Sequence, residues 1–298
     1  MKVSIDKGSG FCFGVTRVIE LAEEILDSGK ELYCLGEIVH NEKEVKRLVD
    51  KGMNFIDVSE LEKLRDKHVL IRAHGEPPST YEICNRNNLH ILDGTCPIVR
   101  SLQKKVRGSY GRNDPAEHQV IIYGKNNHPE VIGLNGQTNN NCLVINNVKQ
   151  IENISLKKNV SLYSQTTMDS DGYEEIVEKL KTIAAKDKNR DFNFNNTICR
   201  HISHRQPGLV DFAKNNEMII FVAGRNSSNG KILFEICRKE NPNCKFISEP
   251  AELKQEWFSK VKTVGVTGGT STPGWLLDEV ADKIKGTKPS RRLFSKPA

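Results

Sequence analysis

The sequence predicts an α/β protein made of three similar domains, each with a small parallel sheet. Strand-sized apolar runs alternate with helix-like runs along all 298 residues, which is typical of α/β folds. The order strand, polar loop, helix also returns in three long internal repeats, each made of three such modules. A cysteine stands in the first module of every repeat. These observations predict a pseudo-threefold arrangement, a trefoil of three α/β domains.

The first module of each repeat is an extended stretch, a cysteine and a helical pattern. Gly14 and Pro97 mark two of the junctions, and Phe11 and Phe13 beside the first cysteine are interpreted as core. The three stretches read VSIDKGSGFCFGVTRVIELAEEIL, LHILDGTCPIVRSLQKKV and FNFNNTICRHISHRQPGLVDFA. Their cysteines are Cys12, Cys96 and Cys199.

The second and third modules each place a polar loop between a strand and a helix. The second modules read LYCLGEIVHNEKEVKRLV, VIIYGKNNHPEVIGL and IIFVAGRNSSNGKILFEIC. Their loops contain His40 and Asn41, then His128 and Glu130, then Ser227, Ser228 and Asn229. The third modules read HVLIRAHGEPPSTYEIC, VSLYSQTTMDSDGYEEIV and TVGVTGGTSTPGWLLDEV, with His74, Thr166 and Ser271 in their loops.

The repeats also predict where the domains begin and end. We expect a first domain at 1–95, including the N-terminal strand and the Cys12 loop, a second at 96–198 and a third at 199–285. The basic tail, 286–298, is expected to fray. Ligands of open parallel sheets bind beyond the carboxyl ends of the strands. Since every polar loop follows a strand, a trefoil would aim all nine loops at one central cleft.

Composition indicates an ordinary, somewhat polar globular protein. Hydrophobic residues make up 37% of the chain and charged residues 28%. The longest apolar runs, VIIY and MIIFVA, are far too short to span a membrane, and the start MKVSIDKGSG contains no apolar signal segment, so we expect a cytoplasmic protein. The net charge of +6 fits an anionic substrate or an acidic protein partner. No basic run with interleaved aromatic residues indicates nucleic-acid binding.

The eight cysteines favour a site built by the fold over a disulfide framework. A reducing cytosol disfavours disulfides, and the absence of any CxxC pair disfavours zinc ribbons and thioredoxin-like motifs. Three thiols, one per domain, at equivalent positions instead indicate a metal site. A 4Fe–4S cluster held by three cysteines has one iron open to act as a Lewis acid on a substrate oxygen. The other cysteines are interpreted as core: Cys34, Cys84, Cys142, Cys237 and Cys244.

The loops supply the donors that an anion requires. Backbone N–H groups at helix N-termini, together with hydroxyl and amide groups, cradle phosphate, and GRNSSNGK and GGTSTPG are good candidates. Several such loops in register favour a diphosphate, whose charge the loop histidines can offset as imidazolium. Glu130 is the carboxylate of its loop and is our candidate proton donor.

The residues alone leave other functions open. One is a phosphosugar isomerase or transferase that uses the Ser/Thr-rich loops and no metal. Another is a non-catalytic protein with a structural zinc held by three thiolates and a histidine. A dinucleotide-binding protein is disfavoured, because no GxGxxG follows the first strand.

Taken in order, the motifs are similar to those of the 4-hydroxy-3-methylbut-2-enyl diphosphate reductases, the LytB family. They are GFCFGV, DGTCPIV, NHPEV, SQTT, NTICR, NSSN and VTGGTSTP, and the resemblance runs from Val3 to Lys285. It implies a trefoil around a central, oxygen-sensitive iron–sulfur cluster. It also implies an oxidoreductase that converts (E)-4-hydroxy-3-methylbut-2-enyl diphosphate to isopentenyl and dimethylallyl diphosphates. This is the last step of the methylerythritol phosphate (non-mevalonate) pathway of isoprene biosynthesis.

The resemblance also implies roles for individual residues. Glu130 matches the proton-delivering acid and Thr166 the hydroxyl that positions or relays the proton. The three ligands of a 4Fe–4S cluster match Cys12, Cys96 and Cys199. The diphosphate-binding residues match His40, His74, His128, Ser227, Ser228, Asn229 and Ser271. Electrons are expected from an acidic donor such as ferredoxin or flavodoxin. In one departure, CRHISHRQPGLV stands where many members have a CYATTNRQ-type stretch.

Overall fold

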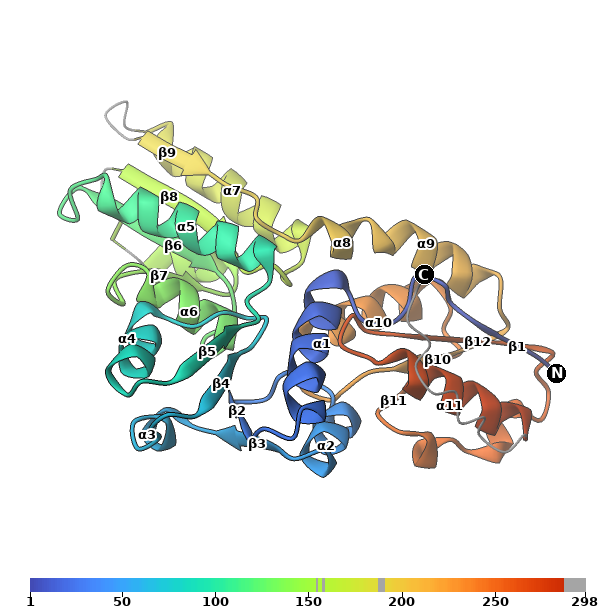
Figure 1. Cartoon of the computed structure of the whole chain (residues 1–298). Coiled ribbons are helices and arrows are strands. Elements are labelled where there is room, and N and C mark those ends of the chain that lie inside the picture. Colours follow the sequence, from blue (N-terminus) through green and yellow to red (C-terminus); the bar gives the residue numbers. More distant parts are fainter. Residues whose placement is uncertain (154, 157–158, 187–190, 287–298) are drawn as a thin grey trace. The chain divides into compact units, whose positions relative to one another are not determined.

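The computed structural model describes residues 1–153, 155–156, 159–186 and 191–286, and it contains three separate parallel sheets of four strands each (Figure 1). Sheet A has the order β1 (Lys2–Ile5), β12 (Thr263–Gly268), β10 (Met218–Val222), β11 (Cys244–Ile247). Sheet B has the order β3 (Met53–Ile56), β2 (Leu32–Leu35), β4 (His68–Ile71), β5 (His90–Asp93). Sheet C has the order β7 (Leu143–Ile145), β6 (His118–Tyr123), β8 (Asn159–Ser164), β9 (Asp191–Phe194). The predicted α/β class with three parallel-sheet domains is confirmed.

Helices connect the strands in the predicted alternation. They are α1 (Phe13–Asp27), α2 (Glu42–Asp50), α3 (Val58–Leu61), α4 (Pro78–Arg86), α5 (Pro97–Gly111), α6 (Pro129–Gly136), α7 (Ser170–Ala184), α8 (Arg200–Ser203), α9 (Arg205–Lys214), α10 (Ser228–Glu240) and α11 (Gly274–Lys285). Three short 3₁₀ turns, η1 (Val148–Asn153), η2 (Pro250–Glu252) and η3 (Gln255–Phe258), complete the connections. None of the helices in the described ranges is long and apolar enough to cross a bilayer.

The central strands are buried on both faces because helices cover both sides of each sheet. In β10, Met218, Ile220 and Val222 pack in one cluster with residues of α11. The alternate residues Ile219 and Phe221 pack in another cluster with residues of α9 and α10. The period of two along the strand therefore divides the core of sheet A into two layers. Figure 1 shows these helices on opposite faces of the sheet.

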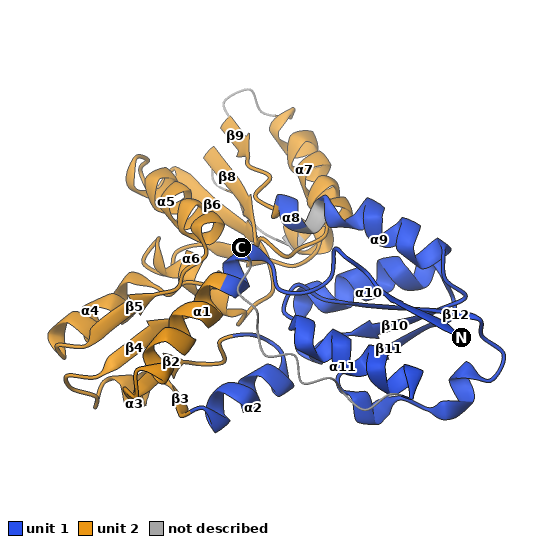
Figure 2. Cartoon of the chain, turned by 45° about the vertical axis from the view of Figure 1, so that its right-hand side comes forward, with its two compact units in different colours: residues 1–16, 39–51, 200–298 blue, residues 17–38, 52–199 orange. Residues whose placement is uncertain are grey.

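The chain forms two compact units, which Figure 2 distinguishes by colour. Unit 1 comprises residues 1–16, 39–51 and the part that begins at 200, and it contains sheet A and α2. Unit 2 comprises residues 17–38 and 52–199, with sheets B and C. Helix α2 joins unit 1 through a hydrogen bond of 2.8 Å from Trp275 Nε1 to Glu44 Oε2.

The N-terminal strand lies in a different sheet from the predicted one. The repeats predict it in the first domain, but β1 pairs with β12, in a register that sets Val3 beside Val264 and Ile5 beside Val266. Both apolar side chains of β1 pack against the core of sheet A, and this burial draws the strand there. The predicted boundaries at 95/96 and 198/199 stay a prediction. Of the predicted basic tail, all but Gly286 lies outside the described residues.

Because β1 belongs to sheet A, each of the three first-module cysteines follows an edge strand of a different sheet. Strands β1, β5 and β9 are each at an edge of their sheet, next to β12, β4 and β8 respectively. Each of these edge strands is the last element before one of the cysteines of the first modules. A second expectation was wrong: Phe13 is 62% exposed, because it is the first residue of α1 and precedes the buried face of that helix, which begins with Gly14 and Val18.

Candidate active site

The three first-module cysteines occupy equivalent places in the backbone. Each donates its main-chain N–H to a carbonyl in the loop that follows the strand next to its own edge strand. The pairs are Cys12 with Thr270 at 3.2 Å, Cys96 with Ala73 at 3.0 Å and Cys199 with Thr166 at 2.9 Å. The sequence repeat is therefore also a repeat of hydrogen bonding, and each bond fixes one cysteine to the polar loop of its own sheet.

These thiols differ from most of the others in exposure. Cys12, Cys96 and Cys199 are half-buried and each directly precedes a helix. Cys34, Cys84, Cys237 and Cys244 are buried core residues as expected, and Cys142 is half-buried with its sulfur 3.0 Å from the Thr138 hydroxyl. No disulfide joins the eight cysteines, all of which lie in the described ranges.

Unit 2 contains a buried carboxylate that is held by a single residue. Glu130 is 1% exposed, and its two oxygens accept hydrogen bonds from the Thr166 N–H and the Thr166 hydroxyl, both at 2.7 Å. Burial raises the pKa of Glu130 to about 7, while the two Thr166 hydrogen bonds oppose that rise. A carboxyl group with such a pKa can carry a proton at neutral pH and release it.

The same threonine connects the acid to a cysteine. The Thr166 carbonyl accepts the Cys199 N–H at 2.9 Å, so Glu130, Thr166 and Cys199 form one chain of contacts. The neighbouring Gln165 orients this loop: its Oε1 accepts the Lys125 N–H at 3.0 Å and its Nε2 donates to the Thr167 hydroxyl at 2.7 Å. Gln165 belongs to the SQTT motif of the sequence, which gave this residue no role of its own.

Two of the predicted histidines lie next to each other in unit 2. The rings of His74 and His128 meet edge to face, with centroids 5.4 Å apart. His128 is the N-cap of α6, and its Nδ1 accepts the Glu130 N–H at 3.2 Å, which assigns the imidazole proton to Nε2. One capping bond therefore orients both the imidazole and the start of the helix that carries the acid.

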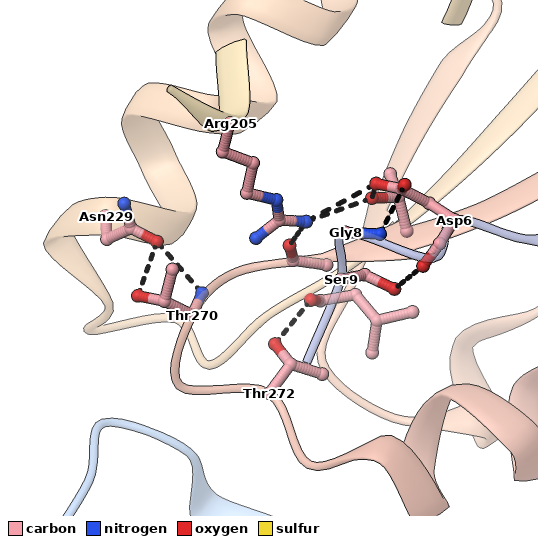
Figure 3. A network of polar contacts seen from close by, with 10 residues as sticks. Asp6, Gly8, Ser9, Arg205, Asn229, Thr270 and Thr272 are labelled. Carbon is pink, nitrogen blue, oxygen red and sulfur yellow. Dashed lines mark hydrogen bonds and ion pairs between the residues drawn. The ribbon is translucent and has the colours of Figure 1, made fainter. Parts of the chain in front are cut away.

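Unit 1 contains a cluster of hydroxyl and amide groups at the N-terminus of α10. Ser227 caps the helix by accepting the Gly230 N–H at 3.0 Å, and its hydroxyl lies 3.1 Å from that of Ser271. Asn229 Oδ1 accepts both the N–H and the hydroxyl of Thr270, at 2.9 and 2.8 Å (Figure 3). These bonds join the second-module and third-module loops of the last repeat.

The side-chain amide nitrogen of Asn229 is a buried donor that these hydrogen bonds do not use. Asn229 is 4% exposed, and among the described residues its Nδ2 has no hydrogen-bond partner. Burying an unpaired N–H is costly, so such a group in a folded protein indicates a missing acceptor. The helix N-terminus adds positive potential at the same place. The arrangement suits a phosphate group.

His40 belongs to the same part of unit 1. A Cβ at Gly224 would lie 2.1 Å from the His40 carbonyl oxygen, so only glycine permits the β10–α10 loop to approach the His40–Asn41 backbone. Asn41 then caps α2 by accepting the Glu44 N–H at 3.1 Å. The N-termini of α2 and α10 therefore lie together, and His40 stands at the first of them.

The predicted site residues form two groups. Unit 1 contains Cys12, His40, Ser227, Ser228, Asn229 and Ser271, and unit 2 contains His74, Cys96, His128, Glu130, Thr166 and Cys199. Within each unit the hydrogen bonds described above connect most of the group. The convergence of both groups on one cleft stays a prediction.

Comparisons with known proteins point to one family. The profile of the LytB protein family matches residues 3–285 of the chain. A protein of Parabacteroides distasonis named 4-hydroxy-3-methylbut-2-enyl diphosphate reductase is 48% identical over 285 residues, which cover 96% of this chain and 98% of the relative. A protein of the same name from Bacteroides thetaiotaomicron is 46% identical over the same shares of both chains.

Solved structures give the same answer. One of (E)-4-hydroxy-3-methyl-but-2-enyl diphosphate reductase, described as the terminal enzyme of the non-mevalonate pathway, aligns with a TM-score of 0.72 and 33% identity over 96% of this chain and all of that chain. The E-1-hydroxy-2-methyl-but-2-enyl-4-diphosphate reductase of Plasmodium falciparum aligns with a TM-score of 0.82 and 27% identity, over 95% of this chain and 87% of that chain.

Proposed function

Because the chain belongs to the LytB protein family, we propose that it reduces (E)-4-hydroxy-3-methylbut-2-enyl diphosphate to isopentenyl and dimethylallyl diphosphates. The observation that carries this is 48% identity, over 96% of the chain, to a reductase of that name. The family resemblance predicted from the motifs is thereby confirmed. In the proposed reaction the substrate takes up two electrons and two protons, its allylic C–O bond breaks, and one water molecule leaves.

Cys12, Cys96 and Cys199 would hold a 4Fe–4S cluster. The chain's residues fit this group: three half-buried thiols stand at equivalent backbone positions before helices, and the main-chain N–H of each is already hydrogen-bonded to a loop carbonyl. When bound, such a cluster supplies electrons and, at the iron without a protein ligand, a Lewis acid for the substrate hydroxyl. Three protein thiolates leave that one position open.

The donors of unit 1 would bind and orient the diphosphate. Ser227, Ser271 and the unpaired Nδ2 of Asn229 offer neutral hydrogen bonds, and the N-terminus of α10 adds positive potential. Ser228, 7% exposed, lies in the first turn of that helix. The imidazoles of His40 and His74 would offset phosphate charge when protonated, and neutral His128, whose Nδ1 accepts the Glu130 N–H, would donate from Nε2. Holding the diphosphate fixes where the hydroxyl end of the substrate can reach.

Glu130 would supply the proton that converts the hydroxyl into water. Its burial keeps the carboxyl group protonated near neutral pH, and the Thr166 hydroxyl, 2.7 Å away, can pass the proton on or orient the acid. Because both Thr166 bonds favour the carboxylate, they also stabilise Glu130 after the proton has left.

We further propose an acidic electron-donor protein, such as ferredoxin or flavodoxin, as the partner. The net charge of +6 supports attraction to an acidic surface, an effect that salt would screen. A reducing compartment, the cytoplasm, suits eight cysteines without a disulfide and a cluster that requires thiolates.

The test is anaerobic turnover of the purified, cluster-loaded chain with the alcohol diphosphate and a chemically reduced dye, followed by mass spectrometry of the products. We expect both C5 diphosphates to form, and we expect Cys96→Ser to abolish their formation. A wild-type chain that contains an intact cluster but leaves the substrate unchanged would contradict the proposed reaction. Turnover that survives serine at all three cysteine positions would favour the metal-free phosphate enzyme instead.

A further inference from the structure

Arg205, the first residue of α9, is a buried cation that none of the steps above uses. Its side chain is 7% exposed. One nitrogen, Nη2, donates to the Gly268 carbonyl at 2.5 Å and to the Thr267 hydroxyl at 3.2 Å, and it lies 3.6 Å from Asp6 Oδ2. All of these partners belong to unit 1, and Figure 3 shows the guanidinium group directed at the Asp6 carboxylate.

Asp6 builds the turn that leads to Cys12. Its Oδ1 accepts the Gly8 N–H at 2.9 Å, its carbonyl accepts the Ser9 N–H at 3.0 Å, and its Oδ2 accepts the Thr267 hydroxyl at 2.8 Å. Side-chain bonds of this type fix the backbone of a short loop. The carboxylate therefore shapes one end of the loop that carries the first cluster thiol and ties it to the end of β12.

The other contacts of Arg205 lead to the diphosphate loop. Gly268 ends β12, and Thr270 follows two residues later, where its carbonyl accepts the Cys12 N–H and its N–H and hydroxyl bind Asn229. The next residue, Ser271, reaches the Ser227 hydroxyl. Arg205 thus connects the start of the Cys12 loop with the start of the loop that carries Ser271.

Two further donors of Arg205 are unused. Within the part of the chain that the structure describes, Nε and Nη1 are buried and have no hydrogen-bond partner. A residue retained for stability alone would gain from pairing all its donors, because each buried unpaired N–H is costly. Arginine left in this state beside two loops of a binding site indicates a functional constraint.

We propose that Arg205, with Asp6, is a positioning residue that sets the thiol of Cys12 in register with the diphosphate-binding hydroxyls. This inference rests on the proposed function. The ion pair with Asp6 and the bonds to Thr267 and Gly268 are the contacts through which it acts. Loss of Arg205 changes the cluster and substrate binding together, because one guanidinium group holds both loops.

The test compares Arg205→Gln with Leu209→Ala, anaerobically and with the cluster-loaded full chain. Leu209 lies one turn further along α9, is 1% exposed and packs only in the apolar core, so its truncation matches a loss of stability without touching the network. The measurements are thermal stability, iron per chain, the electron paramagnetic resonance spectrum and reduction potential of the cluster, and KM for the alcohol diphosphate.

For Arg205→Gln we expect an altered resonance spectrum, a shifted reduction potential and a KM raised about tenfold, because both loops lose the group that connects them. Leu209→Ala should lower thermal stability and leave these three quantities at wild-type values. Arg205→Gln with wild-type spectrum, potential and KM would overturn the proposal. If that variant does not fold, Asp6→Asn replaces it, with an altered resonance spectrum and a raised KM expected, because the same two loops lose their connection; wild-type values of both quantities would overturn the proposal. A wild-type chain that binds no cluster would instead refute the proposed function.

Discussion

Glu130 shows how a single residue acquires chemistry from its surroundings. Its carboxyl group is buried, and the groups that bind it are the N–H and the hydroxyl of Thr166. Burial disfavours the charged form more than these two bonds favour it, so the pKa rises to about 7. The carboxyl group can therefore both hold and release a proton near neutral pH.

Replacing this acid tests its role directly. Glu130→Gln keeps the shape of the side chain and removes the proton, so we expect kcat to fall by about 10²–10⁴-fold, with substrate binding retained. The measurement is single-turnover and steady-state kinetics with a reduced dye. Glu152→Gln is the control, because Glu152 is an exposed partner of Lys179 and should turn over normally. Near-wild-type turnover of Glu130→Gln would remove Glu130 from the acid role.

The pKa of Glu130 also predicts how stability varies with pH. The folded state keeps this proton up to about pH 7, whereas the unfolded chain loses it near 4.5, so the free energy of unfolding falls as the pH rises between these values. The loss amounts to about 3 kcal/mol. Glu130→Gln lacks it. Denaturant unfolding at pH 5 and pH 8 measures this difference. Between these two pH values the free energy of unfolding of Glu130→Gln should rise relative to that of the wild type by about 3 kcal/mol, and equal pH profiles of the two proteins would contradict this.

Replacing Thr166 tests the pKa of Glu130 without changing the acid itself. Thr166→Val removes the hydroxyl hydrogen bond that favours the carboxylate but keeps the N–H, so the pKa of Glu130 should rise further. The alkaline limb of the pH profile of kcat/KM, where activity is lost as the acid deprotonates, should move to higher pH. An unmoved or lowered limb would show that this hydrogen bond does not tune the acid.

Among the elements, the proposed diphosphate site depends on how closely the β10–α10 loop approaches the backbone at the start of α2. Gly224 permits this approach, since a Cβ there would lie 2.1 Å from the His40 carbonyl oxygen and 2.9 Å from Asn41 Cα. Both contacts are with backbone atoms, which cannot rotate away. The loop or the helix start would therefore have to move.

Gly224→Ala should raise KM for the substrate several-fold and destabilise the fold by about 1–3 kcal/mol, the usual range for overpacking. Gly274→Ala is the matched control: Gly274 begins α11, and nothing lies within 4 Å of a Cβ placed there. Alanine favours a helix by up to about 1 kcal/mol over glycine, so the control should be neutral or stabilising. Enzyme kinetics and thermal unfolding of both variants would decide, and an unchanged KM for Gly224→Ala would contradict the account.

In the molecule as a whole, the periodic pattern of the sequence predicts the helices and strands better than it predicts which strands pair with each other. Alternating runs and the threefold repeat were sufficient for the parallel sheets, the polar loops and the equivalence of the three cysteines. They could not reveal that β1 pairs with β12, because this contact joins residues about 260 positions apart and depends on the burial of Val3 and Ile5. The local pattern of apolar residues does not specify which sheet an edge strand joins.

The candidate site likewise contains residues that the sequence predicts and contacts that it does not. Residue types and loop positions indicated Glu130 and the serines, and the family resemblance assigned their roles. The contact of Asp6 with Arg205 escaped sequence reasoning, since charged residues in a loop and on a helix start are ordinarily solvated. Phe13 was misplaced for the converse reason: an aromatic residue in an apolar run is usually core, but here it stands before the buried face of α1 begins.

Iron and acid-labile sulfide per chain after anaerobic purification show whether Cys12, Cys96 and Cys199 together hold one iron–sulfur cluster. We expect a brown wild-type protein with about four irons, broad absorbance near ~400 nm, and loss of the cluster when any one of the three is replaced by serine. Cys142→Ser, at a half-buried cysteine outside the set, should keep its cluster. A colourless wild type that iron and sulfide cannot reconstitute, or a Cys142→Ser variant as depleted as Cys96→Ser, would contradict it.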